Sequence, residues 1–357
     1  MGAQDTFEAS LNRSNKIWED LEVNPGKYRV LTGDRPTGSL HLGHYFGTLK
    51  NRVDLQNRGL ETFIIIADYQ VLTDRESAAA VADNVREVIL DYLAAGLDPF
   101  DKQTVIFCHS HIPELNQLLL PFLTLVTVPE LERNPTIKEE IASANLKVVN
   151  GCMLTYPVHQ AADILFCKGN IVPVGRDQLP HLEISRKIAR RFNERFSPKN
   201  PVFPEPAALL SETPHILGLD GKAKMSKSLG NSIVLKWTEK ETEKAIKKAT
   251  TDSERLITYE PERRPEIANL LKILSLCSDK SSEAWANEIG NGGSGTLKAA
   301  LIETVNNYLR PIRERRAAYE KDPDIVDKVL RAGNEKARRE AEKTLDEVRS
   351  AMNMKYY

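Results

Sequence analysis

Long hydrophobic runs are missing from this 357-residue sequence. Phe63–Ala67, among the longest, is far shorter than the roughly 20 apolar residues of a membrane-spanning helix. The amino-terminal segment is polar and lacks the apolar core of a signal peptide. We therefore expect a cytoplasmic protein without a membrane segment. An excess of positive charge is also missing, since the net charge is −1, so nucleic acid would need a local basic surface.

Cysteines are few, and their spacing does not suit a metal site. Cys108, Cys152, Cys167 and Cys277 lie far apart and do not form the paired spacing of zinc ligands. We expect reduced, mostly buried thiols and no metal ion held by protein side chains.

The glycine-rich stretch Gly33–His44 lacks the features of two common nucleotide motifs. No Gly-Lys-Ser/Thr closes it, as in a P-loop, and its glycine spacing differs from the dinucleotide fingerprint. It follows an apolar run, Tyr28–Leu31, that predicts a strand, and it precedes Tyr45–Arg58, which predicts a helix. Glycines and unpaired N–H groups at a helix start suit a phosphate, with His41 and His44 as candidate donors.

A second basic segment lies far downstream. Lys224-Met225-Ser226-Lys227-Ser228 follows Gly218–Gly221 and predicts a mobile loop. Its two ammonium groups would supply the positive charge that the first stretch lacks.

Strand and helix patterns alternate between these two segments. Thr62–Ala67, Thr104–Cys108 and Ile171–Val174 predict buried strands, and Glu76–Ala95 and Leu179–Phe196 predict helices. Such alternation predicts an α/β fold with a Rossmann-like parallel sheet covered on both faces. Ligands of such sheets lie beyond the carboxyl ends of the strands.

The pattern after the lysine segment is helical. We expect an extension over residues 1–27, a catalytic domain with a helical insertion over 28–236, and a helical bundle over 237–317. Residues 318–357 would form a last helix that returns to the catalytic domain. Gly290–Gly295 predicts a loop, and the last helix has an apolar stripe at Val329, Ala332, Ala337, Ala341, Leu345 and Val348.

The stretch Thr155–Leu165 predicts an amino-acid pocket. On a helix, Tyr156, Gln160 and Asp163 share one face, because residues three and four apart are neighbours. A carboxylate could accept a hydrogen bond from an indole N–H, which only donates.

The His-Leu-Gly-His and Lys-Met-Ser-Lys-Ser motifs together resemble the two signatures of class I aminoacyl-tRNA synthetases. With Tyr156–Ile164 and Val174–Gln178, the sequence is similar to bacterial-type tryptophanyl-tRNA synthetases from about Tyr28 to Met352. This resemblance implies that Asp163 reads the indole and that Tyr156, Gln160 and Gln178 contact the rest of the amino acid. It implies catalytic roles for His41, His44, Lys224 and Lys227, and ATP contacts from Arg35, Pro36, Thr37, Gly43, His44, Gly175, Arg176, Asp177, Ile216, Lys224, Met225, Ser226, Lys227 and Ser228.

The resemblance also implies the partners. They are ATP with Mg²⁺, L-tryptophan and tRNA(Trp), with anticodon recognition by the helical bundle and assembly as a homodimer. Three alternatives stay open: a tyrosine–tRNA ligase, an auxiliary tryptophan-binding paralogue, and a pantothenate-type ligase that adenylates a small molecule.

Several other polar side chains predict structural roles. His109, His111 and His159 read as structural histidines. Arg313, Arg315 and Arg316 read as a solvated helix face, with RNA contact as the alternative.

Overall fold

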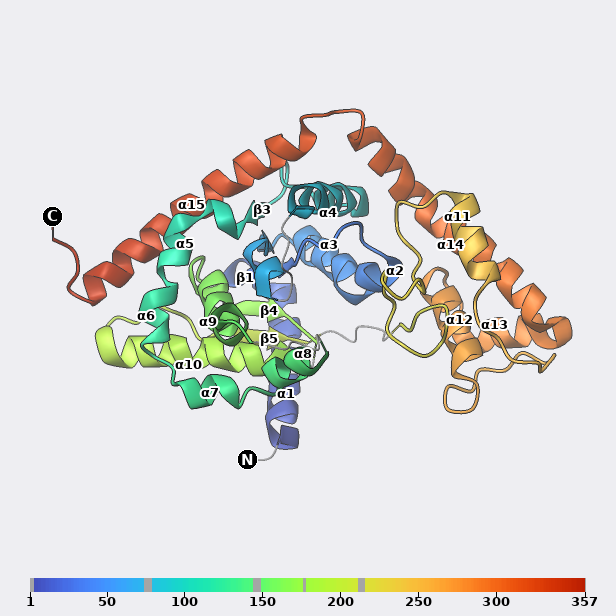
Figure 1. Cartoon of the computed structure of the whole chain (residues 1–357), viewed down its shortest axis with the longest axis horizontal. Helices are drawn as coiled ribbons and strands as arrows, with labels where there is room; N and C mark the ends of the chain where they lie inside the picture. The colour runs from blue at the N-terminus through green and yellow to red at the C-terminus, as the bar shows by residue number, and fades with distance from the viewer. Residues whose placement is uncertain (1–2, 74–78, 144–148, 176–177, 211–215, 357) are drawn as a thin grey trace.

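The computed structural model describes residues 3–73, 79–143, 149–175, 178–210 and 216–356 (Figure 1). A five-stranded parallel sheet, in the order β3-β2-β1-β4-β5, lies at its centre. The predicted α/β fold class is thereby confirmed. The strands are β1 (Arg29–Asp34), β2 (Glu61–Ile66), β3 (Thr104–Cys108), β4 (Ile171–Pro173) and β5 (Ala207–Leu209).

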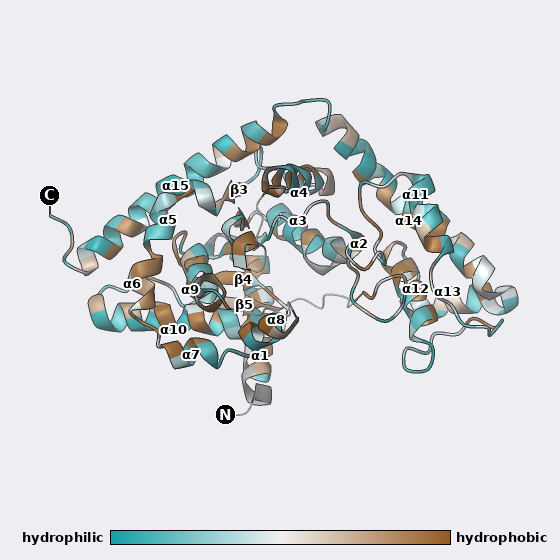
Figure 2. Ribbon diagram, in the orientation of Figure 1, coloured by the Kyte–Doolittle hydropathy of each residue, from teal (hydrophilic) through white to brown (hydrophobic). Residues whose placement is uncertain are grey.

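Both faces of the sheet are buried, as its apolar strands require. Side chains alternate between faces along a strand, so Phe63 and Ile65 of β2 join one apolar cluster and Ile64 and Ile66 join another. Figure 2 shows the strands largely in the hydrophobic colour. This double cover explains why the strands are nearly continuous apolar runs.

Helices from the first two thirds of the chain provide most of this cover. They are α1 (Ala3–Val23), α2 (Leu42–His44), a π-helix (Tyr45–Leu49), α3 (Lys50–Asn57), α4 (Val81–Ala95), α5 (Pro113–Gln117), α6 (Leu119–Leu123), α7 (Val128–Glu132), α8 (Pro135–Ser143), α9 (Gly151–Leu165) and α10 (Leu179–Phe196). Short 3₁₀-helices cover Pro25–Lys27, Tyr69–Thr73, His109–His111 and Gly290–Gly292. None of the helices within the described ranges is long and apolar enough to cross a membrane.

The strand order reverses beside β1, and this reversal positions a site. The chain runs from β1 outward to β2 and β3, then returns to β4 on the other side of β1. Connections leave the sheet in opposite directions at that point, which opens a crevice beyond the carboxyl ends of β1 and β4.

The carboxyl-terminal third is helical and lies beside the sheet (Figure 1). Its helices are α11 (Glu239–Lys247), α12 (Pro265–Leu276), α13 (Ser282–Ile289), α14 (Gly293–Tyr319) and α15 (Ile325–Ala351). Helix α15 runs back over β3 and α5, with Gly333 against the β3 backbone. The apolar stripe that we predicted for this helix is wrong at one position, since Ala332 is exposed and Gly333 is buried instead.

Gly333 permits a contact that no side chain would allow. A Cβ atom there would lie 1.8 Å from the carbonyl oxygen of Ile106. We expect Gly333→Ala to lower the free energy of unfolding by about 1–3 kcal/mol or more, because α15 would have to move away from β3. Gly295→Ala is the matched control, because Gly295 is an exposed residue of α14 and nothing lies within 4 Å of the added Cβ. Urea unfolding measures the stability of both variants. Equal unfolding midpoints for the two variants would contradict the tight packing of α15 against β3.

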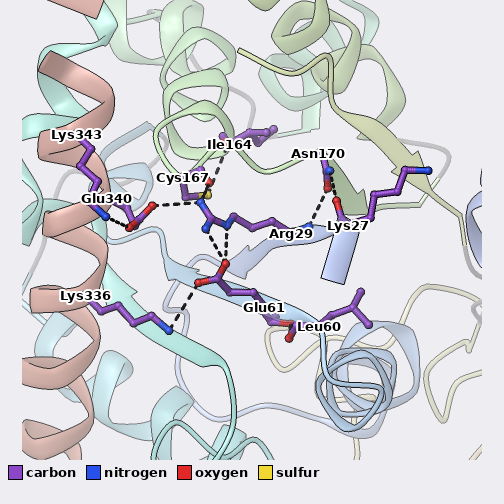
Figure 3. A network of polar contacts seen from close by, with 11 residues as sticks. Lys27, Arg29, Leu60, Glu61, Ile164, Cys167, Asn170, Lys336, Glu340 and Lys343 are labelled. Carbon is purple, nitrogen blue, oxygen red and sulfur yellow. Dashed lines mark hydrogen bonds and ion pairs between the residues drawn. The ribbon is translucent and has the colours of Figure 1, made fainter. Parts of the chain in front are cut away.

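An ion network joins α15 to the amino ends of β1 and β2 (Figure 3). The Arg29 guanidinium donates to Glu61 Oε2 at 2.7 Å, to the Cys167 carbonyl at 2.7 Å and to Glu340 Oε2 of α15 at 3.2 Å. This network lies at the end of the sheet opposite the crevice, so it fixes α15 without entering the site.

Several predicted boundaries differ from the structure. Strand β1 extends to Asp34, so Gly33 lies in the strand, where its close contact with Ile65 excludes a side chain. Helix α9 continues through Pro157, which lies inside it. The predicted Gly290–Gly295 loop is a 3₁₀-helix followed by the first turn of α14.

The sequence patterns also missed part of the structure at the β5 edge of the sheet. This three-residue strand went unpredicted, and most of the extension predicted over residues 1–27 is the long helix α1. Helix α1 packs against β5. Ser14 Oγ of α1 donates to the carbonyl of Leu210, the residue after β5, at 3.1 Å and accepts from the Leu210 amide at 2.8 Å. Helix α1 therefore covers the exposed edge of the sheet.

Candidate active site

A cavity of about 570 Å³ opens at the reversal point of the sheet. Its wall includes the end of β1, the end of β4 and one face of α9. Eight of the predicted site residues line it: Arg35, Thr37, His44, Tyr156, Gln160, Asp163, Gly175 and Gln178. The candidate phosphate site and the candidate amino-acid pocket are thus parts of one cavity.

The two motif histidines cap the helix that starts at this cavity. His44 N donates to His41 Nδ1 at 3.4 Å, and His41 N donates to His44 Nδ1 at 3.3 Å. The rings stack with centroids 3.7 Å apart. Gly43 makes room for this stack, because a Cβ there would lie 3.1 Å from the His41 ring.

Both imidazoles are neutral near pH 7. Burial, His44 and Lys227 lower the pKa of His41 to about 3, and burial lowers the pKa of His44 although Asp34 opposes the shift. A neutral ring carries one proton, and the capping bonds occupy both Nδ1 lone pairs. The protons therefore lie on Nε2, which makes each ring an N–H donor without a charge.

The lowered pKa of His41 predicts a loss of stability in acid. The unfolded chain takes up this proton near the ordinary value of 6.5, whereas the folded chain does so only near 3. His41 therefore contributes its full stabilisation above pH 6.5 and loses it as the pH falls towards 3, by about 2 kcal/mol between pH 6.5 and 5. His41→Asn keeps a capping oxygen but does not titrate, so urea unfolding of the variant should lose less stability from pH 7 to 5. If the stabilities of the wild type and of His41→Asn fell in parallel with pH, the lowered pKa of His41 would be contradicted.

The lysine loop contacts the histidine turn. Lys227 Nζ donates to the Thr37 carbonyl at 2.8 Å and lies near Gly38. Buried Met225 packs next to Gly43, and Ser226 N donates to Asn231 Oδ1 at 2.7 Å. Two motifs about 180 positions apart therefore meet, with one ammonium group beside the two imidazoles.

The opposite wall of the cavity comes from α9. Tyr156, Gln160 and Asp163 all line it, as their helical spacing predicts. The Tyr156 hydroxyl lies 2.7 Å from His181 Nε2, and burial raises the pKa of Tyr156. Asp163 is 2% exposed, and its Oδ1 lies 3.4 Å from His109 Nδ1.

Other predicted site residues lie outside the cavity wall. Lys224 is exposed, Pro36 is buried, and Ile216 belongs to the apolar core. His41, Gly43 and Met225–Ser228 form the turn and loop beside the cavity. Arg176 and Asp177 lie outside the described residues.

Asp34 and Arg52 are cavity residues that the sequence did not single out. Arg52 is 2% exposed and donates to both carboxylate oxygens of Asp34, and the Tyr92 hydroxyl bonds to both residues. Burial would raise the pKa of Asp34, but Arg52 and the hydrogen bonds lower it to about 2. Asp34 lies in the glycine-rich stretch Gly33–His44 and at the end of a strand, and this position was the sequence signal that could have identified it. The pairing explains why this carboxylate stays ionised next to His44 in the cavity wall.

Of the three arginines predicted to form a solvated face, Arg316 is buried and Arg313 is half-buried, whereas Arg315 is exposed. Arg316 of α14 has a side chain 4% exposed and contacts Asp91 Oδ1, with Glu87 Oε2 at 2.8 Å. Asp91 Oδ2 in turn accepts from the Leu40 amide at 2.6 Å, and Glu87 accepts from Ser39 Oγ at 2.6 Å. Arg313 donates to Asn306 and Thr242, and Arg315 donates to the Ala94 carbonyl. The face packs against α4 and α11 and supports the histidine turn.

The fold and this pair of motifs define a class of protein. A family model described as tRNA synthetases class I (W and Y) matches residues 24–310. The chain therefore belongs to the class I aminoacyl-tRNA synthetases of the tryptophan and tyrosine group.

Within the family, the chain is similar to several tryptophan–tRNA ligases. The chain is 43% identical over 337 residues to that of Streptococcus pyogenes, covering 92% of this chain and 98% of the relative. The ligase of Treponema pallidum is 42% identical over 332 residues, covering 91% and 97%. Among solved structures, tryptophanyl-tRNA synthetase of Campylobacter jejuni complexed with ADP and tryptophan has a TM-score of 0.79 at 32% identity, covering 91% and 99%. The tyrosyl-tRNA synthetase of Archaeoglobus fulgidus, at 22% identity, shares the fold with a TM-score of 0.61 and coverage of 81% and 90%.

Proposed function

We propose that this protein is a tryptophan–tRNA ligase, which activates L-tryptophan with ATP and transfers it to tRNA(Trp). The observation that carries the proposal is the single cavity with a buried carboxylate, Asp163, in one wall and the histidine turn at another. The likeness to tryptophan–tRNA ligases favours tryptophan over tyrosine.

In the first step, an oxygen of the tryptophan carboxylate attacks the α-phosphorus of ATP. The bond from this phosphorus to the bridging oxygen breaks, and pyrophosphate leaves with the bond electrons. The substrate is its own nucleophile, so the protein contributes position and charge stabilisation. Lys227 and Lys224 neutralise the leaving pyrophosphate, and His41 and His44 donate from Nε2–H to phosphate oxygens. Mg²⁺ enters as part of the MgATP substrate.

The motif residues divide the rest of the nucleotide between them. Thr37, Gly43 and Gly175 would contact the phosphates and the adenosine, and Arg35 contributes a further cation. Contacts to ATP also come from Pro36, Ile216, Met225, Ser226 and Ser228, and from Arg176 and Asp177 beyond the described residues. Closure of the loop about Gly221 and Gly230, both at positive φ, would bring Lys224 towards the phosphates.

The α9 wall recognises the amino acid. Asp163 accepts a hydrogen bond from the indole N–H, and Tyr156, Gln160 and Gln178 contact the ammonium and carboxylate groups. An acceptor buried in this wall penalises a ligand that leaves it unpaired.

The second step needs a surface for tRNA. The helices α11 to α14 form an appendage, the domain 237–317, that would recognise the anticodon beside the catalytic domain 28–236. The extension 1–27 and the last helix, 318–357, would pack on the catalytic domain. We infer a cytoplasmic homodimer from the family.

A pyrophosphate-exchange assay tests the proposal. Tryptophan should support incorporation of labelled pyrophosphate into ATP, and tyrosine should not. Charging of tRNA(Trp) then separates a ligase from an auxiliary tryptophan-activating paralogue. Exchange that depends on tyrosine, or on neither amino acid, would refute the assigned substrate.

A further inference from the structure

A buried histidine lies behind the carboxylate that we assign to indole recognition. His109 follows β3, and its side chain is 0% exposed. Its Nδ1 lies 3.4 Å from Asp163 Oδ1, and its Nε2 lies 2.7 Å from the Tyr69 amide nitrogen. The ring therefore lies between the α9 wall of the cavity and the 3₁₀-helix that begins at Tyr69.

The Tyr69 amide fixes the tautomer of His109. A backbone N–H only donates, so at 2.7 Å the His109 Nε2 must present a lone pair. In a neutral imidazole the proton then lies on Nδ1, where it points at Asp163 Oδ1. Asp68 Oδ1, 3.2 Å from Nε2, is already an acceptor for the Tyr69 and Ser110 amides.

His159 completes this polar layer. Asn116 Nδ2 donates to the carbonyls of His109 and Ile112, so Asn116 Oδ1 is an acceptor for His159 Nε2–H at 2.7 Å. The His109 and His159 rings lie 4.8 Å apart. Backbone groups thus set the proton positions of both rings from behind the cavity.

We propose that His109 is a positioning residue that holds Asp163 for selection of ligands carrying a ring N–H. This inference rests on the proposed function. The His109 Nδ1–H occupies Oδ1, which leaves the second carboxylate oxygen to accept from the ligand. A ligand without a ring N–H would leave a buried carboxylate oxygen unpaired, and the site would reject it.

The same residues resemble a metal site in composition, but their hydrogen bonds do not suit one. Ligand atoms of His109, His159 and Asp163 lie within 4.8 Å of one another. To bind a metal through Nδ1, His109 would have to lose that proton and carry one on Nε2, where it would oppose the Tyr69 N–H. The observed contacts therefore favour the hydrogen-bonded arrangement.

Two substitutions separate positioning of Asp163 from support of the Tyr69 backbone. In His109→Asn, the amide nitrogen can replace Nδ1–H as a donor to Asp163, but the acceptor for Tyr69 is lost. In His109→Gln, the longer side chain can place its oxygen near Nε2 and keep the Tyr69 bond, but the donor to Asp163 is lost. The readout is kcat/KM in pyrophosphate exchange for tryptophan against its benzothiophene analogue, in which sulfur replaces the ring N–H.

The two variants should diverge. We expect the wild type to prefer tryptophan by at least about tenfold, His109→Asn to keep most of this preference, and His109→Gln to lose it, mainly through KM for tryptophan. The reverse order would show that His109 serves the Tyr69 backbone and would overturn the proposal. A wild type that uses both substrates equally would instead refute indole reading by Asp163, which belongs to the proposed function.

A measurement on the unaltered protein does not depend on the folding of the variants. Nitrogen-15 spectra of labelled histidines should contain an Nδ1–H tautomer, in contrast to the Nε2–H tautomers that the bonds of His41, His44 and His159 require. Absence of any Nδ1–H imidazole would overturn the assignment. So would a rise in melting temperature on addition of Zn²⁺ alone that His159→Gln abolishes.

Discussion

Lys227→Ala should slow tryptophan-dependent pyrophosphate exchange by about 10²–10³-fold. The Lys227 ammonium lies beside the histidine turn, where it donates to the Thr37 carbonyl, and from there it would neutralise charge that develops on the leaving pyrophosphate. Its removal should affect the activation step and spare the amino-acid pocket, because Lys227 does not line the α9 wall. Exchange kinetics and equilibrium binding of tryptophan measure the two effects separately.

Lys222→Ala is the matched control for this prediction. Lys222 lies five positions earlier and is exposed, and the hydrogen bond described for it runs from its backbone N–H to Asp220 Oδ1. It should retain near wild-type exchange. If Lys227→Ala also retained it, Lys227 would be part of a solvated loop and the role in catalysis would be wrong.

Arg316→Met should lower the free energy of unfolding by about 3–5 kcal/mol. Asp91 is 0% exposed, and without Arg316 its carboxylate would keep only the Leu40 amide as a partner among the residues that the structure describes. Urea unfolding at neutral pH measures the loss. Arg310→Met on the same helix, where the arginine side chain is 53% exposed, should change stability by less than about 0.5 kcal/mol.

A double substitution tests the physical reason. Asp91→Asn keeps an oxygen for the Leu40 amide and removes the charge, so it should recover part of the stability lost in Arg316→Met. A double variant as unstable as the sum of the two single variants would mean that packing, and not the stranded carboxylate, accounts for the loss.

Local patterns predicted those elements whose signals are local. Strand Thr104–Cys108 and helix Leu179–Phe196 agree with the structure because apolar periodicity and flanking residues define them. Strand β5 is three residues of ordinary composition, and only pairing with β4 makes it a strand. The burial of Arg316 was likewise hidden, since its partner Asp91 lies 225 positions away.

The residues of the candidate site also divide into those that local motifs reveal and those that only the fold brings together. The motifs that carry His41, His44, Lys227 and Asp163 were readable because their residue types and spacing are specific. His109 was interpreted as structural because its contact with Asp163 joins two elements 54 positions apart. Arg52 was missed because a lone arginine in an amphipathic helix predicts a solvated side chain, and only the fold brings it to Asp34.

The position of α15 has a consequence for biosynthesis. Buried Ala337, Ala341 and Leu345 of this helix belong to the apolar cluster that includes Phe63 and Phe107 of the sheet. Ribosomes make the chain from its amino end, so the part of that face beneath α15 waits for its cover until almost the whole polypeptide has been translated. Throughout that interval, chaperones would meet an open hydrophobic surface on an otherwise assembled sheet.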